Sequence, residues 1–338
     1  MNDTKEKKEF SMIGSSYLIG AVVYYLLTSV VFAIIYRFNP AFVDGGGSTI
    51  LSFGLLFFIG YPLMYFLIKR VPATEIPKKK LGIGMWIVAV FVSYFIMITC
   101  NILGLVVNAQ IGKLTGKGIM NPITEVFGTM NPIVQTLIVV ILAPIIEELV
   151  FRKLIVDRVY KYGEVLAALT SGLMFGLFHG NFQQFIYAFG VGVFFAFIYI
   201  RTGKIVYTMV CHVIMNAFGS LPTLLMGDLD IAKIQNYIFT GQMDAYMEYV
   251  NAHMAQFAVI GLYGMCMMVI ILVGFVLAIV FHKKFKFEQH EGDLEFGQAC
   301  KALFCNVGMI LFGLWWVLNI ALAQFDTSFS EVVMKIIN

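Results

Sequence analysis

Charged residues are scarce in this chain, and their scarcity is the first constraint on its class. Asp, Glu, Lys and Arg make up 13% of the 338 residues, whereas a soluble domain carries about 25%. The basic residues do not gather on a polar face of the kind that contacts nucleic-acid phosphates, so we expect no nucleic-acid partner. Hydrophobic residues supply 60% of the chain and the mean hydropathy is +0.86, which indicates a membrane protein.

Paired cysteines are also missing. The chain has five cysteines, an odd number, and no two of them form a CxxC motif. Most lie in or beside apolar segments, where a free cysteine usually packs as a small hydrophobic residue. We therefore expect no metal or redox role for Cys100, Cys211, Cys266, Cys300 and Cys305.

The apolar residues come in blocks of about 18 or more, the length that a helix needs to cross a bilayer. Lipid offers no partner for backbone N–H and C=O groups, so these blocks should be α-helices. The sequence therefore predicts an all-α, polytopic helical bundle of eight or nine transmembrane helices, in one membrane domain over residues 1–338. The first block is too long for a signal-peptide core and should be an uncleaved span. The nine candidate spans are residues 15–36, 49–68, 81–107, 132–151, 164–180, 183–200, 205–221, 255–281 and 302–324, of which the fifth and the seventh are short.

The charges of the connecting loops predict how the spans are oriented. Basic residues concentrate in the 69–80 loop, after the fourth span, in the RTGK turn at 201–204 and in the HKKFK segment from residue 282. Loops of this kind stay on the cytoplasmic side. The acidic loop at about 222–254 then lies outside, and the N-terminus is cytoplasmic. Residues 243–253 fit a short amphipathic helix on the membrane surface as well as they fit a plain loop.

Two adjacent carboxylates interrupt the fourth span near its basic end. Charge at membrane depth costs at least about 2.5–3.5 kcal/mol, so ionisable residues there are candidates for function. Glu148 and Arg152 are four residues apart and should pair on one helix face. Glu147 points about 100° away from that face, which leaves it for another task such as general-base catalysis. The alternative is a membrane-edge cluster whose longer side chains extend to water.

Two further segments place polar side chains inside apolar helices. In the first, SGLMFGLFHGN, Phe175 and His179 end the fifth span. In the second, YTMVCHVIMNAFG, His212 and Asn216 are four residues apart and share one helix face. Each segment alone also fits ordinary helix packing, with the histidine or the asparagine as an interhelical hydrogen-bonding group.

Taken together, the three segments supply a base to activate water, imidazoles to position it and donors for an oxyanion. They lie on three helices within residues 132–221, which we expect to form a catalytic core.

The motifs read EExxxR at 147–152, FxxxH at 175–179 and HxxxN at 212–216. This order resembles the CAAX-prenyl-endopeptidase and bacteriocin-processing (CPBP, Abi) family of intramembrane proteases. The resemblance covers about a quarter of the chain. It implies a helical membrane fold with a cavity open to the cytoplasmic side, and hydrolysis of peptide bonds in protein or peptide substrates that enter from the membrane or the cytoplasm. Substrates would be prenylated CaaX tails in eukaryotes and leader-type or bacteriocin-related peptides in bacteria. We expect an integral protein of a bacterial cell membrane.

The resemblance also implies roles for single residues. Glu147 would activate water with the help of His179, and His212 and Asn216 would polarise the scissile carbonyl. Glu148, Arg152 and Phe175 would support them. A divalent metal such as zinc would be held by Glu147, His179 and His212, but the same residues also suit a mechanism without metal, which the donors Asn216 and His212 favour slightly.

Two other functions stay open on the sequence alone. One is a non-catalytic immunity or binding protein that holds a peptide on the same scaffold. The other is a proton-coupled transporter in which Glu147 and the histidines relay protons, although such transporters usually contain inverted repeats and none is visible here.

Overall fold

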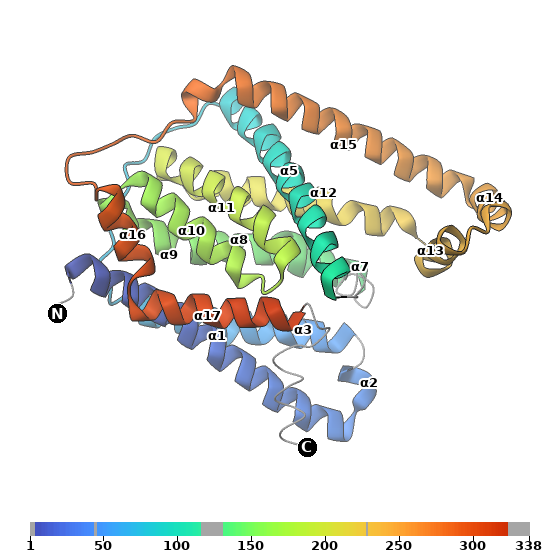
Figure 1. Cartoon of the computed structure of the whole chain (residues 1–338), viewed down its shortest axis with the longest axis horizontal. Coiled ribbons are helices and arrows are strands. Elements are labelled where there is room, and N and C mark those ends of the chain that lie inside the picture. Colours follow the sequence, from blue (N-terminus) through green and yellow to red (C-terminus); the bar gives the residue numbers. More distant parts are fainter. Residues whose placement is uncertain (1–3, 44–45, 116–130, 228, 324–338) are drawn as a thin grey trace.

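The computed structural model describes residues 4–43, 46–115, 131–227 and 229–323. These parts are helices joined by turns and loops, without a strand among them (Figure 1). The all-α prediction is therefore confirmed. The helices are α1 (Lys5–Phe38), α2 (Pro40–Val43), α3 (Gly46–Leu55), α4 (Tyr61–Ile68), α5 (Ile83–Thr115), α7 (Pro132–Gln135), α8 (Ala143–Glu147), α9 (Leu154–Val159), α10 (Glu164–Phe178), α11 (Phe182–Thr202), α12 (Val206–Met226), α13 (Ile231–Thr240), α14 (Met243–Ala252), α15 (Met254–Val280), α16 (Phe296–Phe304) and α17 (Val307–Ala323).

Seven continuous helices in the described residues are long and apolar enough to cross a membrane, and the bent pair α16–α17 makes an eighth. The chain is an integral membrane protein with a polytopic helical bundle, as its composition predicts. The candidate span 164–180 corresponds to α10, which has only 15 residues. Positive-φ glycines, Gly163 and Gly180, stand at its two ends, and glycine is the residue that adopts this conformation without strain.

Two details differ from the sequence-based expectation, and a third resolves an alternative that the sequence left open. The seventh span is not short, because α12 has 21 residues. The last span is not straight, because α16 and α17 meet at an angle of 64°. Asn306 stabilises this bend: its amide nitrogen donates to Ala302 O at 2.7 Å, and its Oδ1 accepts from Met309 N at 2.9 Å. Residues 243–253, which fitted a helix or a loop, form helix α14.

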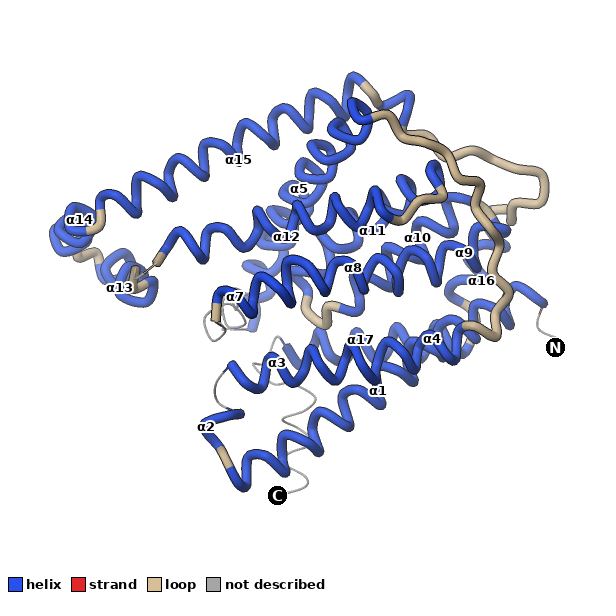
Figure 2. Tube along the Cα trace, turned by 180° about the vertical axis from the view of Figure 1, so that it is seen from behind, coloured by secondary structure: helices blue, strands red, loops and turns tan. Residues whose placement is uncertain are grey.

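Helices α8, α10, α11 and α12 form the centre of the molecule in Figures 1 and 2. Helices α1 and α17 pack against each other on one flank, and α5 and α15 pack together on the other. Glycines allow the tightest contact at the centre. A methyl group on Gly192 of α11 would lie 2.9 Å from the Cα of Gly172 on α10, so these two backbones approach too closely for any larger residue.

The basic loops meet at one end of the bundle. In the 69–82 segment, Thr74 N donates to Asp157 O at 2.5 Å and Lys79 N donates to Thr202 O at 2.8 Å. In the segment after α15, Leu294 N donates to Tyr162 O at 3.1 Å. The structure thus brings together the loops whose charges predicted a common side. That this side is the cytoplasm stays a prediction.

The fourth span, Ile133–Tyr162, is not a regular α-helix. Two segments within it are π-helical: η2 (Thr136–Leu142) before the glutamate pair and η3 (Glu148–Lys153) from Glu148 onward. In a π-helix each N–H bonds the carbonyl five residues back instead of four, which widens the turn, and such turns are frequent at functional sites. The sequence alone did not predict them.

Candidate active site

The glutamate pair lies where α8 meets η3. Glu147 is the last residue of α8 and Glu148 is the first of η3. Glu148 is fully buried, whereas the side chain of Glu147 keeps 20% of its surface exposed. The two neighbouring carboxylates therefore occupy different environments. This difference permits different tasks, one of them structural and the other open to a small molecule.

Glu148 pairs with Arg152 as the four-residue spacing predicts. Glu148 Oε2 lies 3.4 Å from Arg152 Nε, and both side chains are fully buried. The Arg152 guanidinium also lies over the Phe175 ring, with its carbon 4.1 Å from the ring centroid, and 5.6 Å from the centroid of Phe195. Aromatic faces attract cations, so the two rings help to hold a charge that burial would otherwise disfavour.

His212 of α12 contacts both glutamates. Its Nδ1 lies 3.0 Å from Glu148 Oε1, and its Nε2 lies 3.8 Å from Glu147 Oε2. An ionised carboxylate only accepts hydrogen bonds, so the Nδ1 atom carries the proton. In the neutral ring, Nε2 then presents a lone pair toward Glu147. An oxygen atom at the apex of this 3.8 Å separation would stand about 2.8 Å from both atoms, which is hydrogen-bonding distance.

His179 is the residue that directly follows α10, and it joins the same group. Its Nδ1 lies 2.9 Å from Phe175 O, which leaves Nε2 as the nitrogen without that bond. Its ring packs edge-on against the Phe175 ring at 4.8 Å between centroids, and His212 packs edge-on against the same ring at 5.8 Å. His179 is also within electrostatic range of Glu147 and His212. Phe175 therefore sets the spacing between the two imidazoles.

Asn216 lies one helical turn beyond His212 on α12, but its side chain is engaged with the fourth span. Its Nδ2 donates to the backbone carbonyl of Val139 at 2.9 Å. An amide nitrogen carries two hydrogens, so one remains for another acceptor. The sequence-based role for Asn216 involved an oxyanion, and the contact with Val139 adds a structural task that the sequence did not predict.

The three groups suggested as metal ligands do not form a ready ligand set. Among the described residues, only one group of three or more His, Cys, Asp or Glu donors has all its donor atoms within 4.8 Å of one another, and Glu147, His179 and His212 are not that group. His212 Nε2 and Glu147 Oε2 are 3.8 Å apart, so the donor that lies too far from the others is that of His179. As the side chains stand, an ion would require His179 to move.

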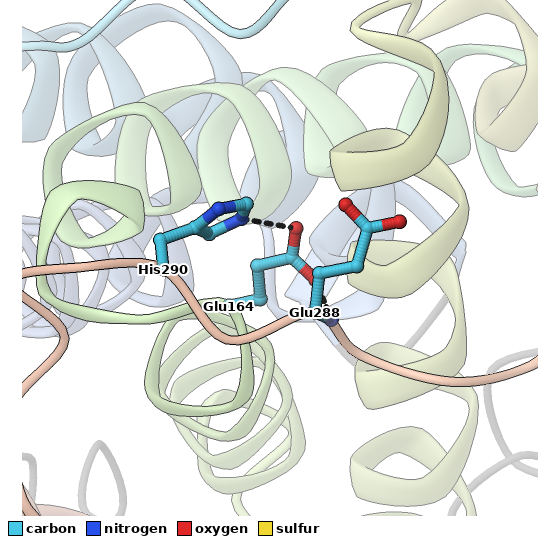
Figure 3. Close-up of side chains that lie close together, drawn as sticks. All are labelled: Glu164, Glu288 and His290. Carbon is cyan, nitrogen blue, oxygen red and sulfur yellow. Dashed lines mark hydrogen bonds and ion pairs between the residues drawn. The ribbon is translucent and has the colours of Figure 1, made fainter.

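The group that does meet this spacing is Glu164, Glu288 and His290 (Figure 3). Glu164, at the start of α10, is buried and accepts from His290 Nε2 at 3.1 Å and from Glu288 N at 2.7 Å. Arg201 also lies 2.8 Å from a carboxylate oxygen of each glutamate. The guanidinium already neutralises one of the two negative charges. We therefore interpret this group as a clamp that fastens the 286–294 segment to the core.

Some contacting residues have no signature in the sequence. Phe195 of α11 packs against His212, with ring centroids 5.7 Å apart. Tyr61 and Tyr187 are within electrostatic range of Glu147. Tyr17 of α1 donates a hydrogen bond to the carbonyl of Val150. These residues come from apolar helices without any spacing pattern, and only the packing of distant helices brings them to the site.

Comparisons with known proteins single out the same region. Residues 129–218 match the family model described as type II CAAX prenyl endopeptidase Rce1-like. The putative membrane peptidase YdiL of Bacillus subtilis (strain 168) is 31% identical over 99 residues, which are 29% of this chain and 38% of YdiL. The membrane-embedded CAAX protease MroQ of Staphylococcus aureus (strain USA300) is 30% identical over 92 residues, which are 25% of this chain and 37% of MroQ.

The similarity is limited to this region. The chain covers less than two fifths of the length of either curated relative. No solved structure matches the chain significantly. Every residue of the three motifs falls within the matched range, 129–218.

Proposed function

We propose that the chain, whose residues 129–218 match the Rce1-like family model and resemble two curated membrane proteases, is an intramembrane endopeptidase that hydrolyses peptide bonds with a glutamate-activated water. The observation that carries the proposal is the approach of Glu147 Oε2 to His212 Nε2, at 3.8 Å, with Glu147 partly exposed and Glu148 fully buried. One oxygen atom can contact both groups at this separation, and a general base must lie within such reach of the proton it takes.

In the proposed reaction, a water donates one hydrogen to Glu147 and the other to the neutral His212. Glu147 takes a proton from the water as the water oxygen bonds to the carbonyl carbon of the substrate. The resulting tetrahedral intermediate expels the amide nitrogen, and Glu147 delivers the proton to that nitrogen as the C–N bond breaks. The remaining hydrogen of the Asn216 amide is the candidate donor to the oxyanion.

The two histidines, which both pack edge-on against Phe175, assist in the reaction. With Nδ1 protonated, both rings offer the Nε2 lone pair to a water. His212 can donate to an oxyanion from Nε2 only after it gains a second proton, and Glu148 would stabilise that imidazolium. We therefore assign His212 first to the water and Asn216 to the carbonyl oxygen. Should zinc be required, Glu147 and His212 would supply two of its ligands and His179 the third after it moves, and the metal would act as a Lewis acid.

We propose that substrates reach the site from the membrane or from the end of the bundle where the basic loops meet, which positive loop charge assigns to the cytoplasm. Suitable substrates are peptides with a hydrophobic or lipid-modified segment, such as CaaX-type tails or leader peptides. The apolar surroundings of the site favour a substrate whose scissile bond lies near an apolar segment.

The proposal is tested with the purified full-length protein and fluorogenic peptides of both kinds, prenylated and leader-type. Glu147→Gln should abolish cleavage because the amide cannot accept the proton, and His212→Ala should lower kcat by about 100-fold or more, as expected for loss of a general acid–base partner. The matched controls are Asp157→Asn, a carboxylate ten residues along the same span, and His282→Ala, an exposed histidine.

Both controls should retain parental rates. Equal rates in the parent and in Glu147→Gln would overturn the assignment, and absence of cleavage in every condition would favour a binding protein. Zinc content measured on the same preparations, together with activity after chelation and zinc addition, tests whether a metal takes part.

A further inference from the structure

The two π-helical segments leave unpaired backbone carbonyls on either side of the glutamate pair. When a helix returns from five-residue to four-residue hydrogen bonds, the ladder skips one carbonyl at the junction. A buried carbonyl without a donor costs about 1–3 kcal/mol, so such an atom needs a partner from elsewhere. The structure supplies one at each junction.

The first skipped carbonyl is that of Val139. The N–H of Ala143, its usual four-residue partner, bonds Ile138 O instead. The next residue, Pro144, has no N–H to offer. The Asn216 amide, from α12, donates to Val139 O at 2.9 Å. Since α12 also carries His212, this bond connects the π-helical segment η2 to the helix whose histidine faces the glutamates.

The second skipped carbonyl is that of Val150. The N–H of Leu154, which would bond Val150 O in a regular α-helix, bonds Leu149 O instead, five residues back. Because η3 ends at Lys153, the five-residue pattern does not continue to the next N–H. The donor to Val150 O is the hydroxyl of Tyr17, a fully buried residue of α1. Tyr17 lies outside residues 129–218, and its ring packs on Phe151 at 5.6 Å between centroids.

We propose that Tyr17 is a positioning residue for the hydrolysis, which fixes the register of the fourth span by capping the Val150 carbonyl while Asn216 caps that of Val139. The inference rests on the proposed function. Glu147 and Glu148 lie between the two capped carbonyls. If a π-helical segment reverts to regular α-helix, or moves along the span past the glutamates, the glutamates turn by about 100° and shift by about 1.5 Å along the helix axis for each residue of register change. A shift of that size would separate Glu147 from His212.

The experiment compares Tyr17→Phe with Tyr199→Phe. Tyr199 is the matched control because its buried hydroxyl donates to Asp157 Oδ1 at 2.7 Å, a bond to the same span that touches neither skipped carbonyl. Tyr17→Phe should lower kcat by about 10- to 100-fold with little change in KM, the loss expected when reacting groups are misplaced by about 1 Å. Tyr199→Phe should keep the parental kcat.

A second readout is independent of catalysis. The protein is labelled with ¹⁵N-histidine, and the His212 signals are assigned by their loss in His212→Gln. Tyr17→Phe should shift the His212 Nδ1 signal, because its bond to Glu148 depends on the register, and Tyr199→Phe should not.

Unchanged His212 signals in a folded Tyr17→Phe protein would overturn the positioning role whether or not the chain proves to be a peptidase. A shifted signal in a parent protein without peptidase activity would retain the register claim and reject the proposed function. Equal losses of kcat in Tyr17→Phe and Tyr199→Phe would indicate that loss of any buried hydroxyl bond to the fourth span lowers activity through stability. That result would also overturn the proposal.

Discussion

His212 Nδ1 lies 3.0 Å from Glu148 Oε1, and Glu148 in turn pairs with Arg152 at 3.4 Å. Glu148, which is fully buried, thus orients the imidazole of His212, and that imidazole faces the partly exposed carboxylate of Glu147. Glu148 pairs with Arg152 because it lies four residues before it on the same helix face. Glu147 lies on a different face, cannot reach Arg152, and therefore remains available to a water or substrate.

The first prediction concerns the orienting carboxylate. Glu148→Gln keeps the shape of the side chain but lowers its strength as an acceptor for His212 Nδ1, so the ring loses its fixed orientation. We expect kcat to fall by about 10- to 100-fold and KM to change little. Steady-state kinetics on the peptide used for the parent measure both constants. An unchanged kcat would show that the His212–Glu148 bond has no part in turnover.

The second prediction concerns the buried ion pair. Arg152→Met leaves Glu148 without its cation, and breaking a buried pair costs about 3–5 kcal/mol. The double variant Arg152→Met with Glu148→Gln removes both charges and should unfold at a higher temperature than Arg152→Met alone. Thermal unfolding in detergent measures this order. Lys78→Met is the control, because the Lys78–Glu75 pair spans 3.9 Å on an exposed surface and such pairs contribute little. A double variant less stable than the single one would contradict the prediction.

The third prediction concerns the contact of α10 with α11. Gly192→Ala places a methyl group 2.9 Å from the Cα of Gly172 and 3.2 Å from the Phe175 ring. The two helices must separate, at a cost of about 1–3 kcal/mol, and the ring that spaces the histidines must shift. Both the unfolding temperature and the cleavage rate should fall. Gly219→Ala is the control because nothing lies within 4 Å of the added atom. Equal behaviour of the two variants would show that the close approach is not needed.

The fourth prediction concerns the clamp at the basic end. Glu164→Gln removes the charge that Arg201 and His290 contact. The 286–294 segment should then detach more often from α10, and limited proteolysis within it should become several-fold faster, since cleavage follows the population of the opened form. Glu75→Gln, at an exposed pair, should leave the rate unchanged. Equal proteolysis in Glu164→Gln and the parent would mean that other contacts hold the segment.

Much of the fold follows from the sequence because lipid imposes simple rules. Apolar blocks of sufficient length predicted every long helix among the described residues, and the loop charges predicted which connections meet at one end. The four-residue spacing of Glu148 and Arg152 predicted their pairing, since side chains at that spacing are neighbours on any helical surface.

The sequence did not reveal features that depend on contacts between distant helices. Whether His212 would bond Glu147 or Glu148 depends on the angle at which α12 crosses the fourth span. The π-helical turns depend on Asn216 and Tyr17, which lie 77 and 133 residues from the carbonyls they cap. The bend at Asn306 depends on a local cap within an apolar block, where hydropathy alone predicts one straight helix.

The pairing of α1 with α17 has a consequence for how the protein is made. Gly14 and Gly308 lie in direct contact, and Gly308 N donates to Ser11 Oγ at 3.0 Å. During translation the first helix enters the bilayer long before its partner exists, so its glycine face must meet lipid or a transient occupant until α17 is inserted. Until then the same face is open to pairing with another helix, so the order of synthesis sets the interval in which wrong pairing can occur.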